Sequence, residues 1–191
     1  MTTSCSCRRR QWLGLAALTT LGAIGSIGAL SLAGCGDRAA DAQAIAPKEF
    51  GADTACELDG MTLADYPGPK AQIHFAGAAD AAAPMFLCDT VELFSTLLQP
   101  EQVRKVQAVY VQDMGRADWD KPRGHWIDAR GALFVRGSKR LGSMGPTLAS
   151  FAQEADAKKF VGEYGGTVLR YGEITPAMVD LGGGSKGDTK M

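Results

Sequence analysis

The fold is indicated most clearly by residues 84–98, whose sequence is PMFLCDTVELFSTLL. Its first five residues form a short apolar run, which predicts a buried strand. Asp89 then offers a side-chain oxygen to a helix N-terminus, and Glu92 stands three residues later, as in a capping box. Apolar residues follow at helical spacing, and Pro100 ends the pattern. The stretch therefore predicts a strand that leads directly into an amphipathic helix.

Further strands are predicted on both sides of this stretch. Residues 71–75 alternate as a strand does, and residues 106–111 carry alternating large apolar side chains. The second half of the chain repeats the order, with strands at 132–136, 147–151 and 167–171 and a helix that ends at Gly165. The pattern predicts an α+β domain of two ββαβ units, in which each helix buries its apolar face on a sheet.

The first 34 residues have the features of a bacterial lipoprotein signal peptide. Three arginines precede an uncharged apolar stretch at residues 12–33, and Leu32-Ala33-Gly34-Cys35 resembles a lipobox with a thiol for lipid attachment. A transmembrane anchor is the alternative, because the stretch is long enough to span a bilayer. Arg9 and Arg10 also fit a twin-arginine signal, so Sec and twin-arginine export both remain open.

The chain is expected to have three parts after the signal peptide. Residues 35–52 are predicted to be a lipidated flexible tether, residues 53–181 the folded domain, and residues 182–191 a disordered tail. The formal net charge of −1 argues against a nucleic-acid partner. Export would place Cys56 and Cys88 in an oxidising compartment. Gly36 lacks the aspartate that favours retention at the inner membrane, so we expect a lipid anchor in the outer membrane.

Soft metal donors are the most informative chemical groups of the predicted domain. Cys56 and Met61 lie five residues apart, and Gly60 between them permits a sharp turn. Thiolate and thioether ligands select Cu(I) over hard cations. Spacing alone leaves two structural alternatives open: Met61 could fill the core, and Cys56 could form a disulfide with Cys88. The sequence contains no Cys/His cluster at zinc spacing and no serine-hydrolase elbow.

Several motifs, in this order, resemble the NosL family of copper lipoproteins. They run from the lipobox to about residue 171 and comprise Cys56-x-x-Asp59-Gly60-Met61, YPGPKAQI at 66–73, VYVQDMG at 109–115, WIDAR at 126–130 and Ser143-Met144-Gly145. Many members of the family carry a second cysteine where this chain has Asp59. The resemblance therefore does not extend to a pair of thiolates within this first motif.

The resemblance implies a periplasmic, lipid-anchored protein that is not an enzyme. Such a protein would bind Cu(I) and supply it for maturation of nitrous oxide reductase, through an ABC-transporter complex and its periplasmic subunit. It also implies a fold similar to part of organomercurial lyase. On this basis the expected metal ligands are Cys56, Met61 and Met144, and Cys35 is the expected lipidation site.

The remaining donors are expected to have lesser roles. His74 alternates with apolar neighbours and is expected to point away from the core, as an outer ligand or a surface residue. Cys88 is expected to be a buried apolar residue, and Asp59, a hard donor, to orient its loop or face a partner. Two other functions remain open: a scaffold lipoprotein stapled by a Cys56–Cys88 disulfide, and a thiol enzyme resembling organomercurial lyase.

Overall fold

The computed structural model describes residues 45–77 and 83–181. The predicted signal peptide, the predicted lipidation site Cys35 and the predicted tail at 182–191 lie outside the described residues. Within the described ranges, no helix combines the length and the apolar character needed to cross a membrane.

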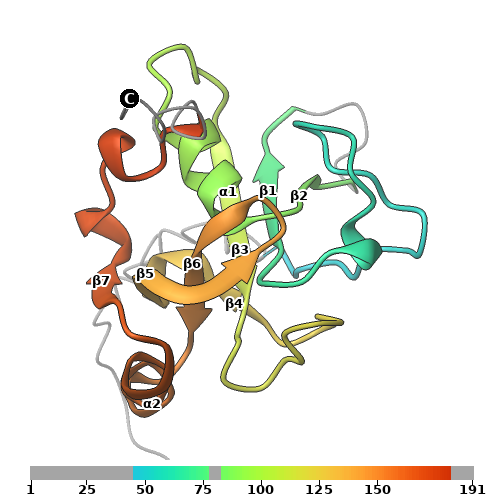
Figure 1. Ribbon diagram of the computed structural model, residues 1–191. Helices are drawn as coiled ribbons and strands as arrows, with labels where there is room; N and C mark the ends of the chain where they lie inside the picture. The colour runs from blue at the N-terminus through green and yellow to red at the C-terminus, as the bar shows by residue number, and fades with distance from the viewer. Residues whose placement is uncertain (1–44, 78–82, 182–191) are drawn as a thin grey trace, which may run out of the picture. The chain divides into compact units, whose positions relative to one another are not determined.

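The strands form two antiparallel sheets (Figure 1). The first sheet has the order β2-β1-β3-β4, from β1 (Ala71–Phe75), β2 (Met85–Leu87), β3 (Val106–Gln112) and β4 (Trp126–Asp128). The second has the order β6-β5-β7, from β5 (Leu133–Gly142), β6 (Gly145–Phe151) and β7 (Thr167–Arg170). The helices are α1 (Thr90–Leu97) and α2 (Glu154–Tyr164), with short 3-10 helices at η1 (Leu63–Asp65), η2 (Ala129–Gly131), η3 (Tyr171–Glu173) and η4 (Pro176–Met178).

The predicted pair of ββαβ units is present. In each unit the first strand lies between the second and the third, so the order β2-β1-β3 is matched by β6-β5-β7. Two features were not predicted. β4 adds an edge strand of only three residues to the first sheet, and β5 extends to Gly142, where a tight turn leads into β6. β4 is too short to produce a detectable hydrophobic period, and the added residues of β5, at 137–142, are mostly polar or glycine.

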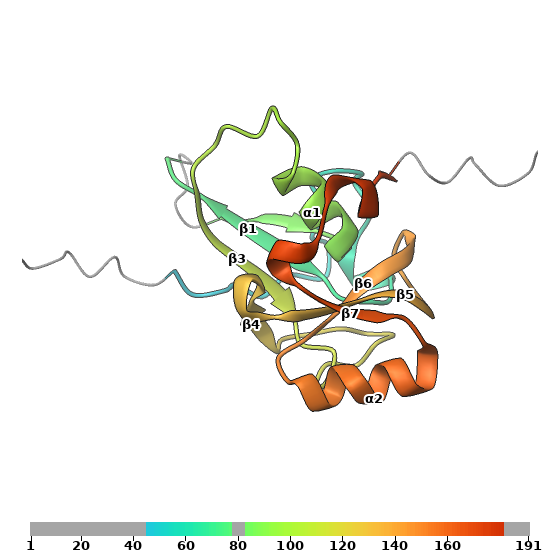
Figure 2. The same ribbon diagram turned by 90° about the vertical axis from the view of Figure 1, so that its left-hand side faces the viewer.

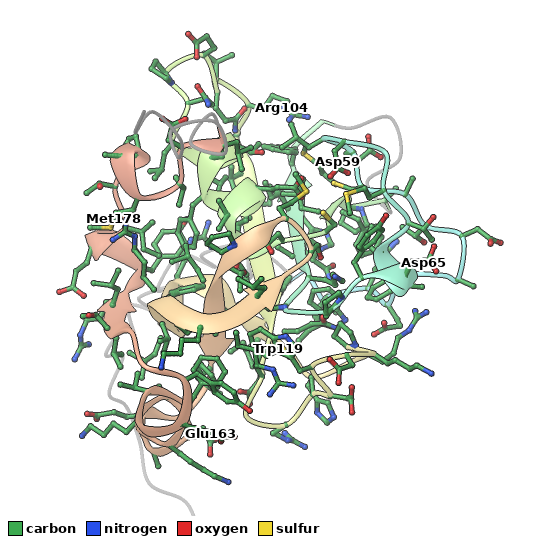
Figure 3. All side chains as sticks on the ribbon, in the orientation of Figure 1. Asp59, Asp65, Arg104, Trp119, Glu163 and Met178 are labelled. Atoms are coloured by element: carbon green, nitrogen blue, oxygen red, sulfur yellow. The ribbon has the colours of Figure 1, made fainter. Side chains whose placement is uncertain are left out.

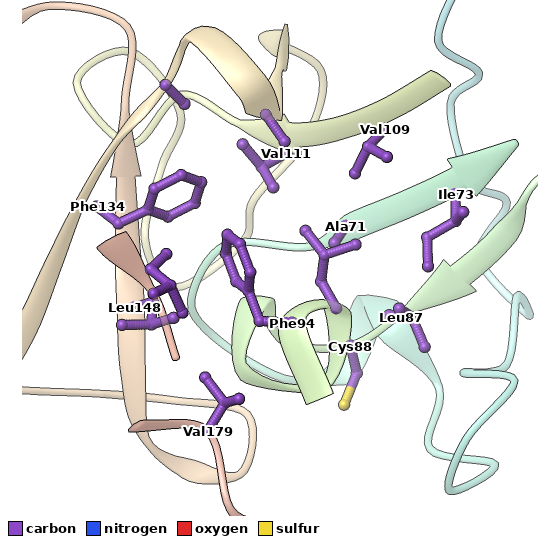
Figure 4. Close-up of a cluster of buried hydrophobic side chains, with 14 of the residues drawn as sticks. Ala71, Ile73, Leu87, Cys88, Phe94, Val109, Val111, Phe134, Leu148 and Val179 are labelled. Carbon is purple, nitrogen blue, oxygen red and sulfur yellow. The ribbon is translucent and has the colours of Figure 1, made fainter. Parts of the chain in front are cut away.

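Helix α1 packs against both sheets and closes the main hydrophobic core. Phe94 of α1 meets Phe134 of β5 edge to face, with ring centroids 5.0 Å apart. At the start of the helix, the Thr90 hydroxyl donates a 2.6 Å hydrogen bond to the carbonyl of Leu148 on β6. Figure 4 shows these apolar side chains facing Ala71, Val109 and other residues of the first sheet. The N-terminus of α1 is consequently buried.

Helix α2 covers the second sheet on the side away from α1 (Figure 2). A smaller aromatic core lies beneath it, in which Trp119 and Phe160 stack with centroids 5.4 Å apart. Gly165 ends α2 with φ of +75°, as its predicted position after the helix requires. The second unit thus has its own core, built mainly from apolar side chains.

The segment at 45–50, assigned by the sequence to the tether, packs against the first sheet. Phe50 is only 3% exposed, and Lys48 exchanges two backbone hydrogen bonds with the Gln72 side chain. The surface position expected for His74 was wrong: the residue is buried, and its Nε2 lies 2.9 Å from Gln72 Oε1. Because this segment covers the outer face of β1, both faces of the strand are buried and an outward side chain meets protein instead of solvent.

Candidate metal centre

A tight loop positions Cys56. The loop is closed by an isolated bridge between Ala55 and Thr62 and by a 2.8 Å hydrogen bond from the Cys56 N–H to the Met61 carbonyl. Gly60 has φ of +76°, the conformation that its predicted turn needs. The Glu57 N–H then donates to the carbonyl of Phe86 at 3.0 Å, which fixes the loop to β2. This contact brings Cys56 beside the end of β2, where Cys88 lies.

Cys88 and Glu92 stand on either side of the junction between β2 and α1. Asp89 is the N-cap of α1, and its side chain accepts a hydrogen bond from the Val91 N–H, as predicted. Glu92 lies one helical turn further and points back toward the strand. It does not complete the predicted capping box, because its Oε2 accepts from the N–H of Cys88, at 3.0 Å, and from two thiols.

Four donor groups therefore converge at one place: Cys56, Asp59, Cys88 and Glu92 have ligand atoms that all lie within 4.8 Å of one another. Both sulfur atoms lie 3.2 Å from Glu92 Oε2. Asp59 is exposed, and its Oδ2 lies 3.6 Å from the Cys88 sulfur. Sulfur atoms gather beside the label of Asp59 in Figure 3. In Figure 4 the Cys88 sulfur points away from the labelled apolar side chains. The cluster has a buried floor and one solvent-facing carboxylate.

The two thiols differ in how firmly they hold their protons. The hydrogen bond between them lowers the pKa of Cys56, although burial acts in the opposite direction. The same bond, together with burial and the negative charge of Glu92, raises the pKa of Cys88. Both cysteines are free in the structure. Cys56 therefore loses its proton more readily than Cys88, and a metal ion that binds both sulfur atoms must displace both thiol protons.

The carboxyl groups of the cluster also respond to their surroundings. Burial raises the pKa of Glu92 even though both thiols donate hydrogen bonds to it. For Asp59, burial again favours the neutral form, but the N–H of Met61 at 2.9 Å and the nearby thiols outweigh it and lower the pKa. Asp59 therefore orients the loop through the backbone of Met61, which is one of the roles predicted for it.

A second layer of buried polar residues surrounds the cluster. Lys70 donates hydrogen bonds to the carbonyls of Pro67 and Cys88, and burial lowers its pKa to about 8. Burial also raises the pKa of Asp89 to about 6. Gly142 leaves room for this carboxyl group, since a Cβ there would lie 2.4 Å from Asp89 Oδ2. Ser143 bonds the carbonyl of Cys88 at 2.6 Å and so ties the β5–β6 turn to the site.

The predicted ligands occupy different positions in this arrangement. Cys56 belongs to the cluster. Met61 lies on the same loop, and its half-buried side chain packs against the main core. Met144 is 45% exposed on the β5–β6 turn, next to Ser143. Cys88 is buried, as expected, yet its sulfur is also one of the four donor groups.

Glu92 was not predicted as a site residue. Its position three residues after the N-cap suggested only a cap. Its contact with Cys88 is local, four residues back, whereas its contact with Cys56 depends on long-range packing. Met114 packs against the second core and His125 is exposed, with φ of +53°.

The donor set suits a soft, low-coordinate ion. Two sulfur donors in a mostly buried cluster favour Cu(I), and the carboxylates can accept protons or serve as additional donors.

Comparisons with known proteins agree with this chemistry. The NosL family model matches residues 47–179. The chain is 41% identical to the copper-binding lipoprotein NosL of Stutzerimonas stutzeri, over 79% of this chain and 77% of the relative. It is 39% identical to the copper-binding lipoprotein NosL of Achromobacter cycloclastes, over 72% of each chain.

A solved structure matches as well. The crystal structure of the copper chaperone NosL from Shewanella denitrificans is similar with a TM-score of 0.65 and 40% identity, over 69% of this chain and 97% of that one. These relatives are named as metal-binding proteins and not as enzymes. The family model and the extent of the identities together show that this chain belongs to the NosL family.

Proposed function

We propose that the protein is a Cu(I) chaperone that loads copper at the cluster of Cys56 and Cys88. The observation that supports this most directly is the position of both sulfur atoms at 3.2 Å from one oxygen of Glu92. Donors that already converge lose little conformational entropy when an ion binds. Relatives named copper-binding lipoprotein and copper chaperone support copper as the cargo.

The proposed ligand set starts from the sequence prediction and adds one residue. Cys56 is the first thiolate and Cys88 the second, while Met61 and Met144 are thioether donors on the adjoining loop and turn. Met144 is exposed on a turn that Ser143 holds against Cys88. An exposed thioether at this position could receive copper from the buried thiolates and present it to an acceptor, so that release proceeds by stepwise ligand exchange.

The proposed cellular setting follows from the signal peptide and the family. Lipid on Cys35 would hold the protein at the periplasmic face of a membrane, with the outer membrane favoured over the inner. Copper would pass to the machinery that matures nitrous oxide reductase, an ABC-transporter complex with a periplasmic subunit. The likeness to part of organomercurial lyase remains a prediction about the fold.

The test is an anaerobic Cu(I) titration of the full chain in detergent, against a chromophoric chelator of known affinity. We expect tight binding by the wild type, loss of that binding in Cys56→Ala, and smaller losses in Met61→Ala and Met144→Ala. Met114→Ala is the matched control, because Met114 packs against the other core. Binding by the wild type that is no tighter than binding by Cys56→Ala would disprove the proposed site.

The disulfide scaffold is the second candidate, because the two sulfur atoms lie within 4.8 Å of each other. It requires a stable Cys56–Cys88 bridge and hence no thiolate for copper. Thiol counting in protein isolated from the cell envelope distinguishes the two functions. Free Cys56 and Cys88 support the chaperone, whereas a bridge that persists in copper-replete cells supports the scaffold.

A further inference from the structure

Lys70 occupies an unusual place for a lysine, because its side chain is completely buried. Its Nζ donates to the carbonyl of Pro67 at 3.0 Å, to the carbonyl of Cys88 at 3.1 Å and to the Ser143 hydroxyl at 2.6 Å. All three partners are uncharged. The ion pairs found among the described residues, Arg123 with Glu49 and Lys158 with Glu154, do not include Lys70. A buried cation without an ionic partner is costly, so its retention needs a reason.

The ammonium group is next to the metal cluster, because Cys88, whose carbonyl it bonds, also supplies one of the cluster's sulfur atoms. The negative forms of Cys88, Asp89, Glu92 and Cys56 all act to raise the pKa of Lys70. Asp89 and Glu92 are buried, and each has one oxygen without a hydrogen-bond partner among the described residues. The charge of Lys70 therefore acts through space on the cluster, while its hydrogen bonds go to two backbone carbonyls and a hydroxyl instead of the four donor side chains.

Loading with different ions changes the charge of the cluster by different amounts. When Cu(I) binds two thiols, two protons leave and one positive charge enters, so the cluster becomes more negative by one unit. When a divalent soft ion such as Cd(II) binds the same thiols, two protons leave and two positive charges enter, and the net charge stays the same. A fixed positive charge nearby therefore stabilises the cluster loaded with Cu(I), and it leaves the free energy of Cd(II) binding unchanged.

We propose that Lys70 is a specificity-determining residue, whose buried charge makes the thiol pair favour a monovalent ion over divalent soft ions. This inference rests on the proposed function, since it assumes that Cys56 and Cys88 both bind the ion. Lys70 acts through the electrostatic field and through the Cys88 carbonyl, and it does not contact the ion.

The test compares Cu(I) and Cd(II) affinities of the full chain in detergent at pH 7, under anaerobic and reducing conditions. Cu(I) is measured by competition with a chelator, and Cd(II) by its thiolate charge-transfer absorbance. We expect Lys70→Met and Lys70→Gln to weaken Cu(I) binding by about tenfold or more and to change Cd(II) binding by less than about threefold. Glutamine keeps hydrogen-bond donors, so this second variant separates lost charge from lost hydrogen bonds.

Lys158→Met is the matched control, because it removes a positive charge from an exposed ion pair on α2. We expect its ratio of Cu(I) to Cd(II) affinity to equal that of the wild type. Equal losses for both ions in the Lys70 variants would show a purely structural role and overturn the inference, as would an unchanged ratio. Failure of the proposed function is distinguishable, because in that case the wild type itself would not bind Cu(I) tightly.

Discussion

The two ββαβ units share one strand order but differ at the junction between the second strand and the helix. In the first unit the junction holds Cys88 and Asp89, and Glu92 follows one turn later, all of them buried. In the second unit the equivalent positions hold Ala152, Gln153 and Asp156, and Gln153 makes no side-chain cap hydrogen bond. The comparison shows that the topology supplies two equivalent junctions, and that the first one carries the group of side chains that could hold a metal ion.

The different environments of the two helices explain this difference. Helix α1 packs against both sheets, so the polar groups at its N-terminus are cut off from water and must find partners inside the protein. Helix α2 covers the outer side of the second sheet, and Gln153 and Glu154 at its start are exposed. Buried carboxyl groups can hold thiols in place at the first junction, whereas water would compete for them at the second.

The largest expected effect concerns the two cores. Phe94→Ala and Phe160→Ala should each destabilise the protein by about 3–5 kcal/mol, because each leaves a cavity in an aromatic cluster. Chemical denaturation measures this loss. Cu(I) affinity should separate the variants: Phe94→Ala moves the helix that carries Glu92 and weakens binding, whereas Phe160→Ala leaves binding unchanged. Equal weakening by both would contradict the separation of the cores.

The next effect concerns the junction itself. Cys88→Ala gives the first junction the residue type of the second, and it should weaken Cu(I) binding by about a hundredfold, or roughly 2.7 kcal/mol, because one of two thiolates is lost. Chelator competition measures the affinity. Cys88→Ser is the matched variant: its hydroxyl can replace the hydrogen bond to Glu92 but is a poor Cu(I) ligand, so we expect a similar loss. Wild-type affinity in either variant would remove Cys88 from the site.

The smallest effect comes from giving the second junction the cap of the first. Gln153 has φ of −116° and ψ of 136°, which an N-cap aspartate can adopt. Gln153→Asp should stabilise the protein by about 0.5–1 kcal/mol through a hydrogen bond to the first turn of α2 and through the helix dipole. The midpoint of thermal unfolding should rise, while Cu(I) affinity stays the same. A lower midpoint would show that the N-terminus of α2 is constrained by contacts other than capping.

Local patterns in the sequence determined most of the secondary structure. The predicted strand at 71–75 is β1 in full, Asp89 caps α1 and Gly165 ends α2, since alternation, capping and chain reversal depend only on neighbouring residues. The family was also predicted, because it rests on short motifs in a fixed order, whereas Cys56 as a copper ligand stays a prediction. The surface exposure expected for His74 was wrong, since the strand pattern does not reveal that residues 45–50 cover that face.

Only the tertiary structure decided which groups meet at the site. Cys56 and Glu92 are 36 residues apart, and their 3.2 Å contact exists because the loop before β1 bonds to the carbonyl of Phe86 on β2. Lys70 donates a hydrogen bond to Ser143, which lies 73 residues later in the sequence, and this contact also depends on packing between distant segments. The sequence specifies the donors through residue type, but convergence depends on packing between distant segments, and no local period encodes it.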